Sequence, residues 1–175
     1  MFTKIQNGAV RLALALGCAT VLLAACDNGR VSGTEEGLTT ESEVLAKWGK
    51  PENIWEGPNG EKIYEYSRQP SGTKNYMITI GADGKVAALR QVLTRENFNK
   101  VQPGMMMEDV RLLLGKPAKI TPYHFKKETV YEWRFMEGNA PPGQLFMVTF
   151  DQDLRVLSTG IMDDPRDPSR PEVGR

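Results

Sequence analysis

The chain has 175 residues, of which 40% are hydrophobic and 25% are charged, with 22 basic and 22 acidic side chains. This length suits one domain or two small ones. The balanced charge argues against nucleic acid as a partner, which would demand a basic stripe. With one histidine and two cysteines in the whole chain, the sequence also holds little material for a metal centre or a disulfide framework.

The first 25 residues have the pattern of a secretion signal. Lys4 and Arg11 precede the apolar run "LALALGCATVLLAA", which ends in "LAAC" at Cys26. The run is short for a membrane span, and its end resembles the lipobox of bacterial lipoproteins, in which the cysteine is acylated. The alternatives are an ordinary cleavable signal or an uncleaved anchor with a chance cysteine. We expect residues 1–25 to be a signal peptide and Cys26 to hold the protein on a membrane.

This processing would change the mature chain. Cys18 would leave with the signal and Cys26 would be modified, so no free thiol would remain for a disulfide, a nucleophile or a metal. The formal charge would become −2, because two basic residues and no acidic ones are removed. Asp27 directly follows the cysteine and resembles the inner-membrane retention signal of some enteric bacteria. The polar stretch over residues 26–36 predicts a flexible tether.

The first predicted element after the tether is a short helix. Thr40 and Glu43 form a T-x-x-E capping box at its start. Gly49 and Pro51 supply its end. Its apolar face is made of Val44, Leu45 and Trp48. The segments "NIWE" and "EKIYEYSR" flank "GPNG" and predict a β-hairpin over residues 53–68, and "YMITI" followed by "GADG" predicts a further strand and tight turn.

The following half of the chain repeats this order at a spacing of about 66 to 70 residues. Gly115-Lys116-Pro117 falls on Gly49-Lys50-Pro51, and Val110 falls on Val44. Met106 takes the place of the capping threonine and cannot accept its hydrogen bond, which costs about 1 kcal/mol. The strand segments are "KITPYHF", "TVYEWRF", "QLFMVTF" and "LRVLSTGI". In a direct alignment, residues 145–158 fall on residues 76–89.

These patterns predict an α+β fold of two tandem modules, each a helix followed by an antiparallel sheet. In "YEWRF", apolar and charged residues alternate as in a half-buried antiparallel strand. We expect the first repeat over residues 37–94 and the second over residues 101–161. The end of the chain, residues 162–175, is rich in proline and charge and predicts disorder.

The second repeat resembles a known family. Its segments "GMMMEDVRLLLGKP", "YEWRF" and "LFMVTFDQDLRV" are similar to the SmpA/OmlA domain of the outer-membrane assembly lipoprotein BamE, which has Gly-Met-Thr, then Leu-Gly-x-Pro, then an aromatic strand and an apolar strand ending in Phe-Asp. The match covers about residues 101–160 and, more loosely, residues 37–94. The sequence departs from the family pattern at Met106 and in having two copies. The tandem arrangement is similar to that of the secreted β-lactamase inhibitor protein.

The resemblance implies a non-catalytic binding module without a cofactor. Its partners would be envelope proteins, such as the barrel-assembly machinery. Its location would be the outer membrane, although Asp27 leaves the inner membrane as the alternative location. An inhibitor of a periplasmic or extracellular enzyme is the alternative. The residues themselves agree with this, since no catalytic motif appears and His124 has no second imidazole or suitably spaced acid for a metal or for acid–base work. Asp151 to Asp153 predicts a turn rather than a calcium loop.

Aromatic residues are the best candidates for partner binding. A sheet with helices on one face leaves the other face open, and exposed Trp, Tyr and Arg dominate many interfaces. The candidates are Trp55, Tyr123, Phe125, Trp133 and Arg134, although core packing remains the alternative for each aromatic. Met105 is predicted to pack in the core at the helix start, whereas the pattern leaves Met106 and Met107 undetermined, with an adaptable binding surface as the alternative.

Overall fold

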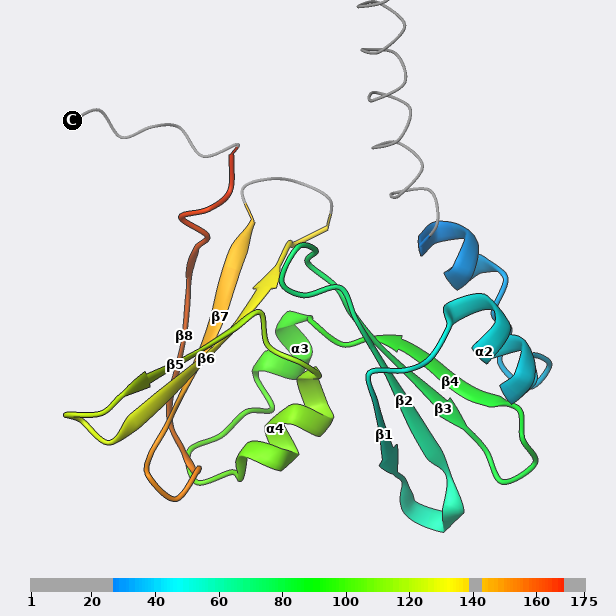
Figure 1. The fold of residues 1–175 in the computed structure, drawn as a ribbon, viewed down its shortest axis with the longest axis horizontal. Coiled ribbons are helices and arrows are strands. Elements are labelled where there is room, and N and C mark those ends of the chain that lie inside the picture. The colour runs from blue at the N-terminus through cyan, green and yellow to red at the C-terminus, as the bar shows by residue number, and fades with distance from the viewer. Residues whose placement is uncertain (1–26, 139–142, 169–175) are drawn as a thin grey trace, which may run out of the picture.

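The computed structural model describes residues 27–138 and 143–168. The predicted signal peptide, Cys26 and residues 169–175 of the predicted tail lie outside this range. The described chain contains two four-stranded antiparallel sheets with strand orders β1-β2-β3-β4 and β5-β6-β7-β8, with helices packed against both (Figure 1). The predicted α+β fold of two tandem modules is therefore confirmed.

Each sheet is built from consecutive strands along the chain. The first module contains α2 (Glu41–Trp48), β1 (Asn53–Glu56), a 3-10 turn (Pro58–Gly60), β2 (Lys62–Ser67), β3 (Asn75–Ile80) and β4 (Val86–Gln91). The second contains α3 (Arg95–Phe98), α4 (Met107–Leu114), β5 (Lys119–Tyr123), β6 (Glu128–Phe135), β7 (Gln144–Phe150) and β8 (Val156–Asp163). The helix α3 was not predicted, because four residues are too few to show helical periodicity.

The predicted helix ends are present. The Thr40 hydroxyl accepts from the Glu43 N–H at 3.4 Å, and the Glu43 carboxylate accepts from the Thr40 N–H at 2.8 Å, which completes the capping box of α2. In α4, Met106 occupies the same position without a side-chain hydrogen bond. Gly49 and Gly115 follow the two helices with φ values of 82° and 74°, a conformation that favours glycine.

The first core lies between α2 and the facing side of its sheet. Val44 and Trp48 of α2 are buried there, as predicted from the helical spacing, whereas Leu45, predicted on the same face, is 40% exposed. The Trp48 ring lies 5.2 Å from the ring of Tyr76, edge to face. The strands contribute Tyr64, Tyr66, Tyr76, Ile78, Ile80 and Val86.

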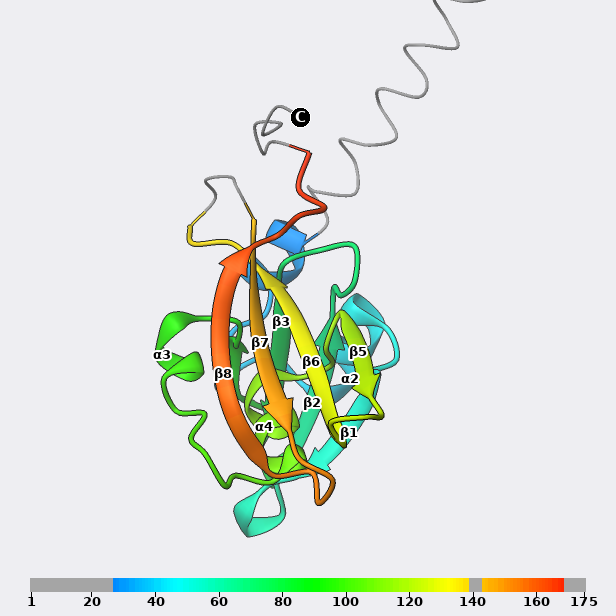
Figure 2. The same cartoon turned by 90° about the vertical axis from the view of Figure 1, so that its left-hand side faces the viewer.

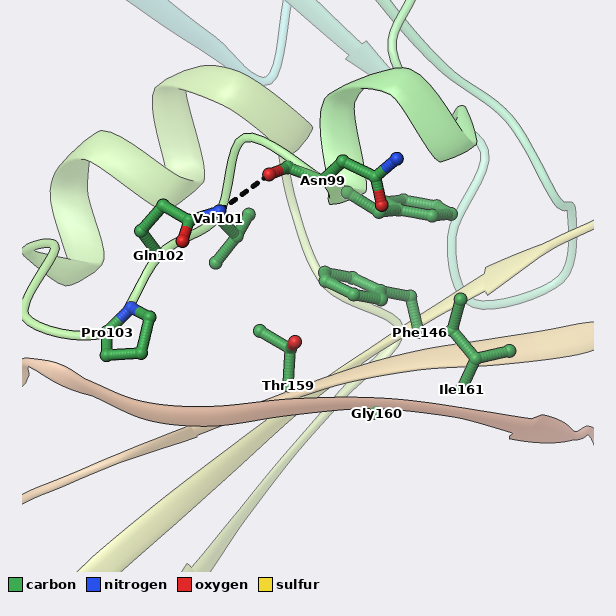
Figure 3. Close-up of a pocket in the computed structure, with 9 residues that line it drawn as sticks. Asn99, Val101, Gln102, Pro103, Phe146, Thr159, Gly160 and Ile161 are labelled. Atoms are coloured by element: carbon green, nitrogen blue, oxygen red, sulfur yellow. Dashed lines mark hydrogen bonds between the residues drawn. The ribbon is translucent and has the colours of Figure 1, made fainter.

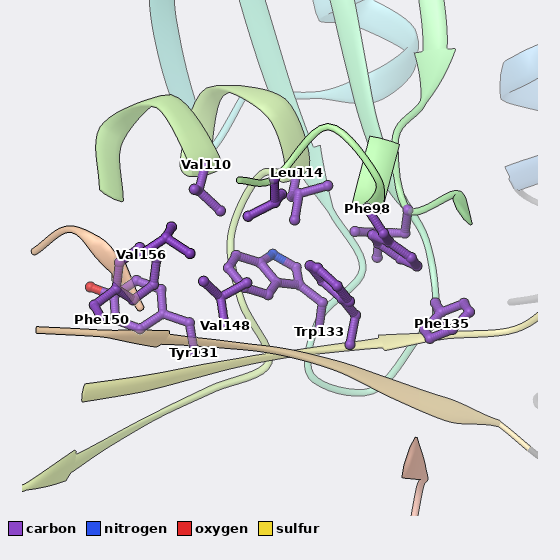
Figure 4. Packing of buried hydrophobic residues seen from close by; sticks show 12 residues of the cluster. Phe98, Val110, Leu114, Tyr131, Trp133, Phe135, Val148, Phe150 and Val156 are labelled. Carbon is purple, nitrogen blue, oxygen red and sulfur yellow. The ribbon is translucent and has the colours of Figure 1, made fainter. Parts of the chain in front are cut away.

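The second core lies between α3, α4 and the second sheet (Figure 4). Phe98 of α3 stacks on Phe146 of β7 with ring centroids 4.2 Å apart. Val110 and Leu114 of α4 point onto the sheet. Met105 packs against this core, as expected for the start of the helix. The strands contribute Tyr131, Trp133, Phe135, Phe146, Val148, Phe150 and Val156.

The end of α4 also contacts the first sheet, so this helix lies between the two sheets (Figure 1). The side-chain amide of Asn75 donates to the carbonyl oxygens of Leu114 and Lys116 at 2.8 and 3.0 Å. The carboxylate of Glu65 accepts from the Lys116 N–H at 2.5 Å. Because Glu65, Asn75 and Met77 are all buried by this contact, much of the far side of β2 and β3 is covered.

The duplication extends to individual backbone contacts. The Gly37 N–H donates to Val86 at 2.7 Å, and the Gly104 N–H donates to Val156 at 2.8 Å. Both sheets carry a register shift before the turn, between Thr79 and Ile80 and between Thr149 and Phe150. These equivalences place residue 76 on residue 146. The alignment of residues 76–89 with residues 145–158 was therefore wrong by one residue, a slip that exchanges the two faces of a strand.

The expected tether over residues 26–36 is wrong for the residues described. Residues 27–32 are helical, and Val31 packs on the first core. The Trp48 indole N–H donates to the Thr34 hydroxyl at 3.0 Å. Val31 and Thr34 occupy the places of Phe98 and Val101 in the second module, so this segment belongs to the repeat. Its polar composition concealed a small apolar face.

The expected disorder from residue 162 onward is also wrong where the structure describes the chain. β8 continues to Asp163. Asp164 is buried, and its carboxylate accepts from the guanidinium groups of Arg134 and Arg166. Burial alone would raise the pKa of Asp164, but hydrogen bonds from Arg166 and Arg134 outweigh it and hold the pKa below 3.8. This ion-pair cluster fixes the segment after β8.

Candidate functional site

The side of the second sheet that faces away from α4 is uncovered in the part of the chain that the structure describes. Figure 2 shows the sheet from this side, with no helix or loop in front of it. Strand alternation places on it the side chains that flank the core residues of β6, β7 and β8. We call this surface the open face and define it by Val130, Glu132, Met147, Thr149, Ser158 and Gly160.

The open face has small residues at its centre. Val130 lies opposite Thr149, which lies opposite Ser158. In the adjacent row Met147 lies opposite Gly160, whose lack of a side chain leaves room above the strand. The result is a shallow depression of about 460 Å³, to which Tyr123, Lys126 and Glu128 contribute one end. A depression of this shape can receive side chains of a partner surface, but it does not enclose a small molecule.

Charged groups lie along one side of the open face, towards β5. The Lys119 ammonium lies 3.8 Å from the carboxylate of Glu132 on the neighbouring strand. Lys126 and Glu128 stand at the β5–β6 turn. The uncharged residues of β7 and β8 and the charged groups near β5, Glu132 among them, follow the usual plan of a protein interface, with a less polar centre and a polar rim.

The β5–β6 hairpin carries exposed aromatic side chains beside this face. Tyr123 is 49% exposed and Phe125 is fully exposed at the tip. The turn is completed by Lys127, which has a φ of 54°. Burying exposed aromatic rings against a partner is favourable, and such residues are frequent anchors of interfaces. The structure therefore brings two of the predicted residues, Tyr123 and Phe125, next to the open face.

Trp133 is not a partner-binding residue, contrary to the prediction. Its side chain is 0% exposed. Its indole N–H donates to the carbonyl oxygen of Gly115 at 2.9 Å. The alternation of "YEWRF" was predicted correctly, but the pattern alone does not tell which face the helices cover. The aromatic face of this strand is the one under α4.

The remaining two predicted residues lie at contacts within the chain. Trp55 is half-buried on β1, where its indole N–H donates to Glu65 at 3.1 Å. The Arg134 guanidinium pairs with Asp164 and donates to the carbonyl oxygen of Pro70 at 3.0 Å. Neither residue lies on the open face as defined above. The sequence did not predict four residues of the open face, Val130, Met147, Thr149 and Ser158. They could have been predicted only by knowing which face of the sheet the helices cover.

Among residues 27–138 and 143–168, the structure shows no cluster of metal-binding side chains. No three His, Cys, Asp or Glu side chains gather there as a metal site would require. His124 is exposed at the hairpin turn. Burial raises the pKa of Tyr64 and of Tyr66 to about 12, so both phenol groups stay neutral. Both side chains pack in the first core. Within the same residues, no helix has the length and apolar character needed to cross a membrane.

The first described residue, Asp27, is held by the first sheet. The Arg68 guanidinium donates to both carboxylate oxygens of Asp27, with N–O distances of 2.7 to 3.0 Å. These hydrogen bonds and the charge of Arg68 hold the pKa of Asp27 below 3.8. The chain therefore leaves the predicted lipidation site at Cys26 and joins the first module within one residue.

Residues 91–160 match the family model described as the outer membrane protein assembly factor BamE domain. The match spans α3 to β8 and so contains the open face, and it confirms the resemblance seen in the second repeat. No curated protein matches the chain.

Two solved structures show a distant likeness. A DUF4309 family protein (YjgB) from Bacillus subtilis is 17% identical, with 75% of this chain and 83% of that one covered, at a TM-score of 0.28. A putative β-lactamase inhibitor protein from Streptococcus mutans is 11% identical, with 71% and 83% covered, at a TM-score of 0.30. Likenesses at this level have no bearing on function.

Proposed function

We propose that this protein is a lipid-anchored, non-catalytic envelope protein that binds another envelope protein through the open face and the β5–β6 hairpin, in outer-membrane protein assembly or envelope integrity. One observation carries the proposal. The segment that matches the BamE domain contains a sheet face that no described element covers. A sheet needs only one covered face to fold, so a second face with small, mostly uncharged residues at its centre is available for a partner.

The contrast between the two repeats supports this assignment. The first sheet uses its far side to bind the end of α4 through Glu65 and Asn75. The equivalent side of the second sheet meets the first module only at its end among the described residues, where the Arg134 guanidinium donates to the carbonyl oxygen of Pro70. We infer that duplication separated two roles, with the first module as a support and the second as the binding module.

The membrane anchor is the second part of the proposal. The lipobox resemblance ends at Cys26, directly before the helix that packs on the first module. Mass spectrometry of the mature protein should find a diacylglyceryl group on Cys26, and Cys26→Ala should leave the protein unprocessed and without this group. An unmodified mature protein released into the periplasm would contradict the anchor without affecting the binding face.

The binding function can be tested by capture of envelope proteins with the intact chain. The double variant Tyr123→Ala/Phe125→Ala should lose most of the captured partner, because exposed aromatic residues at an interface frequently contribute 2 kcal/mol or more, a factor of about 30 in affinity. Its stability should be unchanged. The matched control is Leu38→Ala/Ile54→Ala, which removes two exposed apolar side chains of the first module. Equal loss in both variants would contradict the proposed face.

A further inference from the structure

The first module begins without a spacer after the predicted lipidation site. Asp27 directly follows Cys26, and residues 27–32 are helical. Consecutive Cα atoms are about 3.8 Å apart. The lipid chains of an acylated cysteine lie in the hydrocarbon layer, and the polar layer above it is about 5–8 Å thick. Asp27 of the anchored protein would therefore lie within the lipid headgroups or directly above them.

Asp27 is tied to the first sheet at this point. Arg68, at the start of the turn between β2 and β3, donates to both of its carboxylate oxygens, with N–O distances of 2.7 to 3.0 Å. Arg30 lies 3.6 Å from the same carboxylate. Hydrogen bonds from Arg68 lower the pKa of Asp27 most, and the charges of Arg68, Arg30 and Lys74 lower it further. Three cations thus lie around one carboxylate beside the anchor, an arrangement that suits the phosphate groups of lipid headgroups.

A row of contacts continues from the β2–β3 turn across the same end of both modules. The side-chain amide of Gln69 donates to the carbonyl oxygen of Arg134 at 2.7 Å and accepts from the Arg134 N–H at 3.2 Å. The Arg134 guanidinium donates to the carbonyl oxygen of Pro70 at 3.0 Å and pairs with the buried carboxylate of Asp164. Direct contacts, and not a linker, therefore set the position of the second module relative to the anchor.

Three segments that are far apart in the sequence reach this end of the molecule. They are residues 27–30, the β2–β3 turn over residues 68–74, and residues 164–168 after β8. We call them the anchor end, and all three lie at the upper end of the molecule in Figures 1 and 2. None of the exposed large apolar side chains of the described chain belongs to the anchor end. This surface therefore suits the polar headgroups and not insertion into the hydrocarbon layer.

We propose that the anchor end rests on the lipid headgroups of the membrane that holds Cys26, and that the direct link from Cys26 to Asp27 gives the protein one fixed orientation. The inference rests on the lipid anchor of the proposed function and adds a second contact surface, whose partner is the lipid surface itself. β6 runs from the β5–β6 hairpin to the anchor end, so the hairpin points away from the membrane (Figure 2). With eight residues at about 3.3 Å each, β6 places Tyr123 and Phe125 up to about 25 Å above the lipid.

This orientation leaves the sides of the second module clear of the membrane. The depression of the open face has no lining residue from the anchor end. The same holds for a shallow depression of about 370 Å³ between the segment Asn99–Pro103 and β8 (Figure 3). A partner held in the same membrane can therefore reach the open face from the side.

Fluorescence quenching measures the orientation. Signal removal and lipidation would leave the mature chain without a free thiol, so one introduced cysteine can be labelled. The lipidated, full-length mature protein is placed in phosphatidylcholine vesicles with a nitroxide quencher on the headgroups, and the label is attached at Ser71→Cys or at His124→Cys, both exposed positions. The label at 71 should lose most of its fluorescence and the label at 124 little, because quenching requires contact. Equal quenching, or stronger quenching at 124, would overturn the proposal.

A flexible spacer tests whether the direct link sets the orientation. Eight glycine and serine residues inserted between Cys26 and Asp27 keep the lipid and the fold, but allow the first module to lie about 15 Å from the anchor. Quenching at position 71 should then fall towards the level of position 124. The matched control carries the same insertion after Pro168 and should be quenched like the wild type. Full quenching at 71 with the spacer after Cys26 would overturn the proposal.

Mass spectrometry and capture separate this inference from the proposed function. If the protein carries no lipid on Cys26, the anchor and this inference are both wrong, and the binding face is unaffected. If the lipid is present and the two labels are quenched equally, only this inference is wrong. If the label at 71 alone is quenched and the intact chain captures no envelope protein, the proposed partner binding is wrong and the orientation stands.

Discussion

The indole N–H of Trp133 donates to the carbonyl oxygen of Gly115 at 2.9 Å and so ties β6 to the end of α4. The same contact occurs in the first repeat, where the Tyr66 hydroxyl donates to Gly49 at 2.9 Å. In both repeats an aromatic residue at the same place on the second strand binds the glycine that ends the helix. The most prominent aromatic residue of "YEWRF" is therefore a structural residue.

Trp133→Ala should lower the free energy of unfolding by about 3–5 kcal/mol, because it opens a large cavity in the second core and leaves the Gly115 carbonyl without its partner. Trp133→Phe should cost less, because most of the ring volume remains. Urea denaturation of both variants measures the difference. A loss below about 1 kcal/mol for Trp133→Ala would contradict the buried placement.

The two helix starts form a natural comparison. Thr40→Ala should destabilise the protein by about 1 kcal/mol, since it removes the capping box of α2. Met106→Thr should supply the missing cap of α4. The new hydrogen bond should outweigh the packing lost with the methionine, because that side chain is only half-buried. We expect a gain of about 0.5–1 kcal/mol in thermal unfolding experiments. A loss from Met106→Thr would show that its packing outweighs the cap.

The contact between the modules depends on a buried carboxylate. Glu65 is 0% exposed, accepts from the Lys116 N–H and the Trp55 indole, and lies 3.5 Å from the Arg111 guanidinium. Glu65→Ala should cost about 3 kcal/mol, because it leaves these donors without an acceptor.

Glu52→Ala is the control for this variant. It breaks an exposed ion pair with the Lys116 ammonium at 2.6 Å and should cost less than about 1 kcal/mol. Chemical denaturation measures the free energy of unfolding of both variants. Equal costs would mean that the interface does not depend on Glu65.

Docking of the N-terminal helix should depend on pH through Asp27. Its pKa is lower in the folded protein than the ordinary value of 3.8, because Arg68 stabilises the carboxylate. The contribution to stability is therefore complete above 3.8 and is lost as the pH falls through the lower, folded pKa. Hydrogen exchange over residues 28–34 should accelerate in this range, and Asp27→Asn should produce the same effect at about pH 6.

The helix α3 is the internal reference for this measurement, because Glu96 and Lys100 form only an exposed pair there. Protection of α3 should not change in Asp27→Asn. If residues 28–34 exchange equally fast in the wild type and in Asp27→Asn at about pH 6, the ion pair does not hold the helix in place.

The sequence was sufficient for those features of the fold that depend on local patterns. The capping box at Thr40, the helix ends at Gly49 and Gly115 and the strand alternation around Trp133 each rest on short-range chemistry. They were predicted where the structure has them. The turn at Asp151 was also predicted, and its carboxylate accepts from the N–H groups of Asp153 and Arg155.

The features that depend on which side of a strand is covered could not be predicted. Alternation separates Trp133 from Glu132 but does not say which of them faces a helix. The position of α4 between two sheets places Glu65 in a buried interface, although nothing in "IYEYSR" distinguishes it from a solvated glutamate. Long-range packing decides both points, so the candidate site could be predicted at the hairpin and not on the open face.

The separation of roles between the two repeats is tested most directly by photo-crosslinking in intact cells from equivalent positions. Thr149 lies on the open face, and Thr79 is its counterpart on the first sheet. A photoreactive amino acid is placed at each position in turn. If the open face binds the partner, position 149 should give a covalent adduct with an envelope protein, and position 79 should give little or none. Adducts of equal yield from both positions, or only from position 79, would contradict the assignment of partner binding to the second repeat.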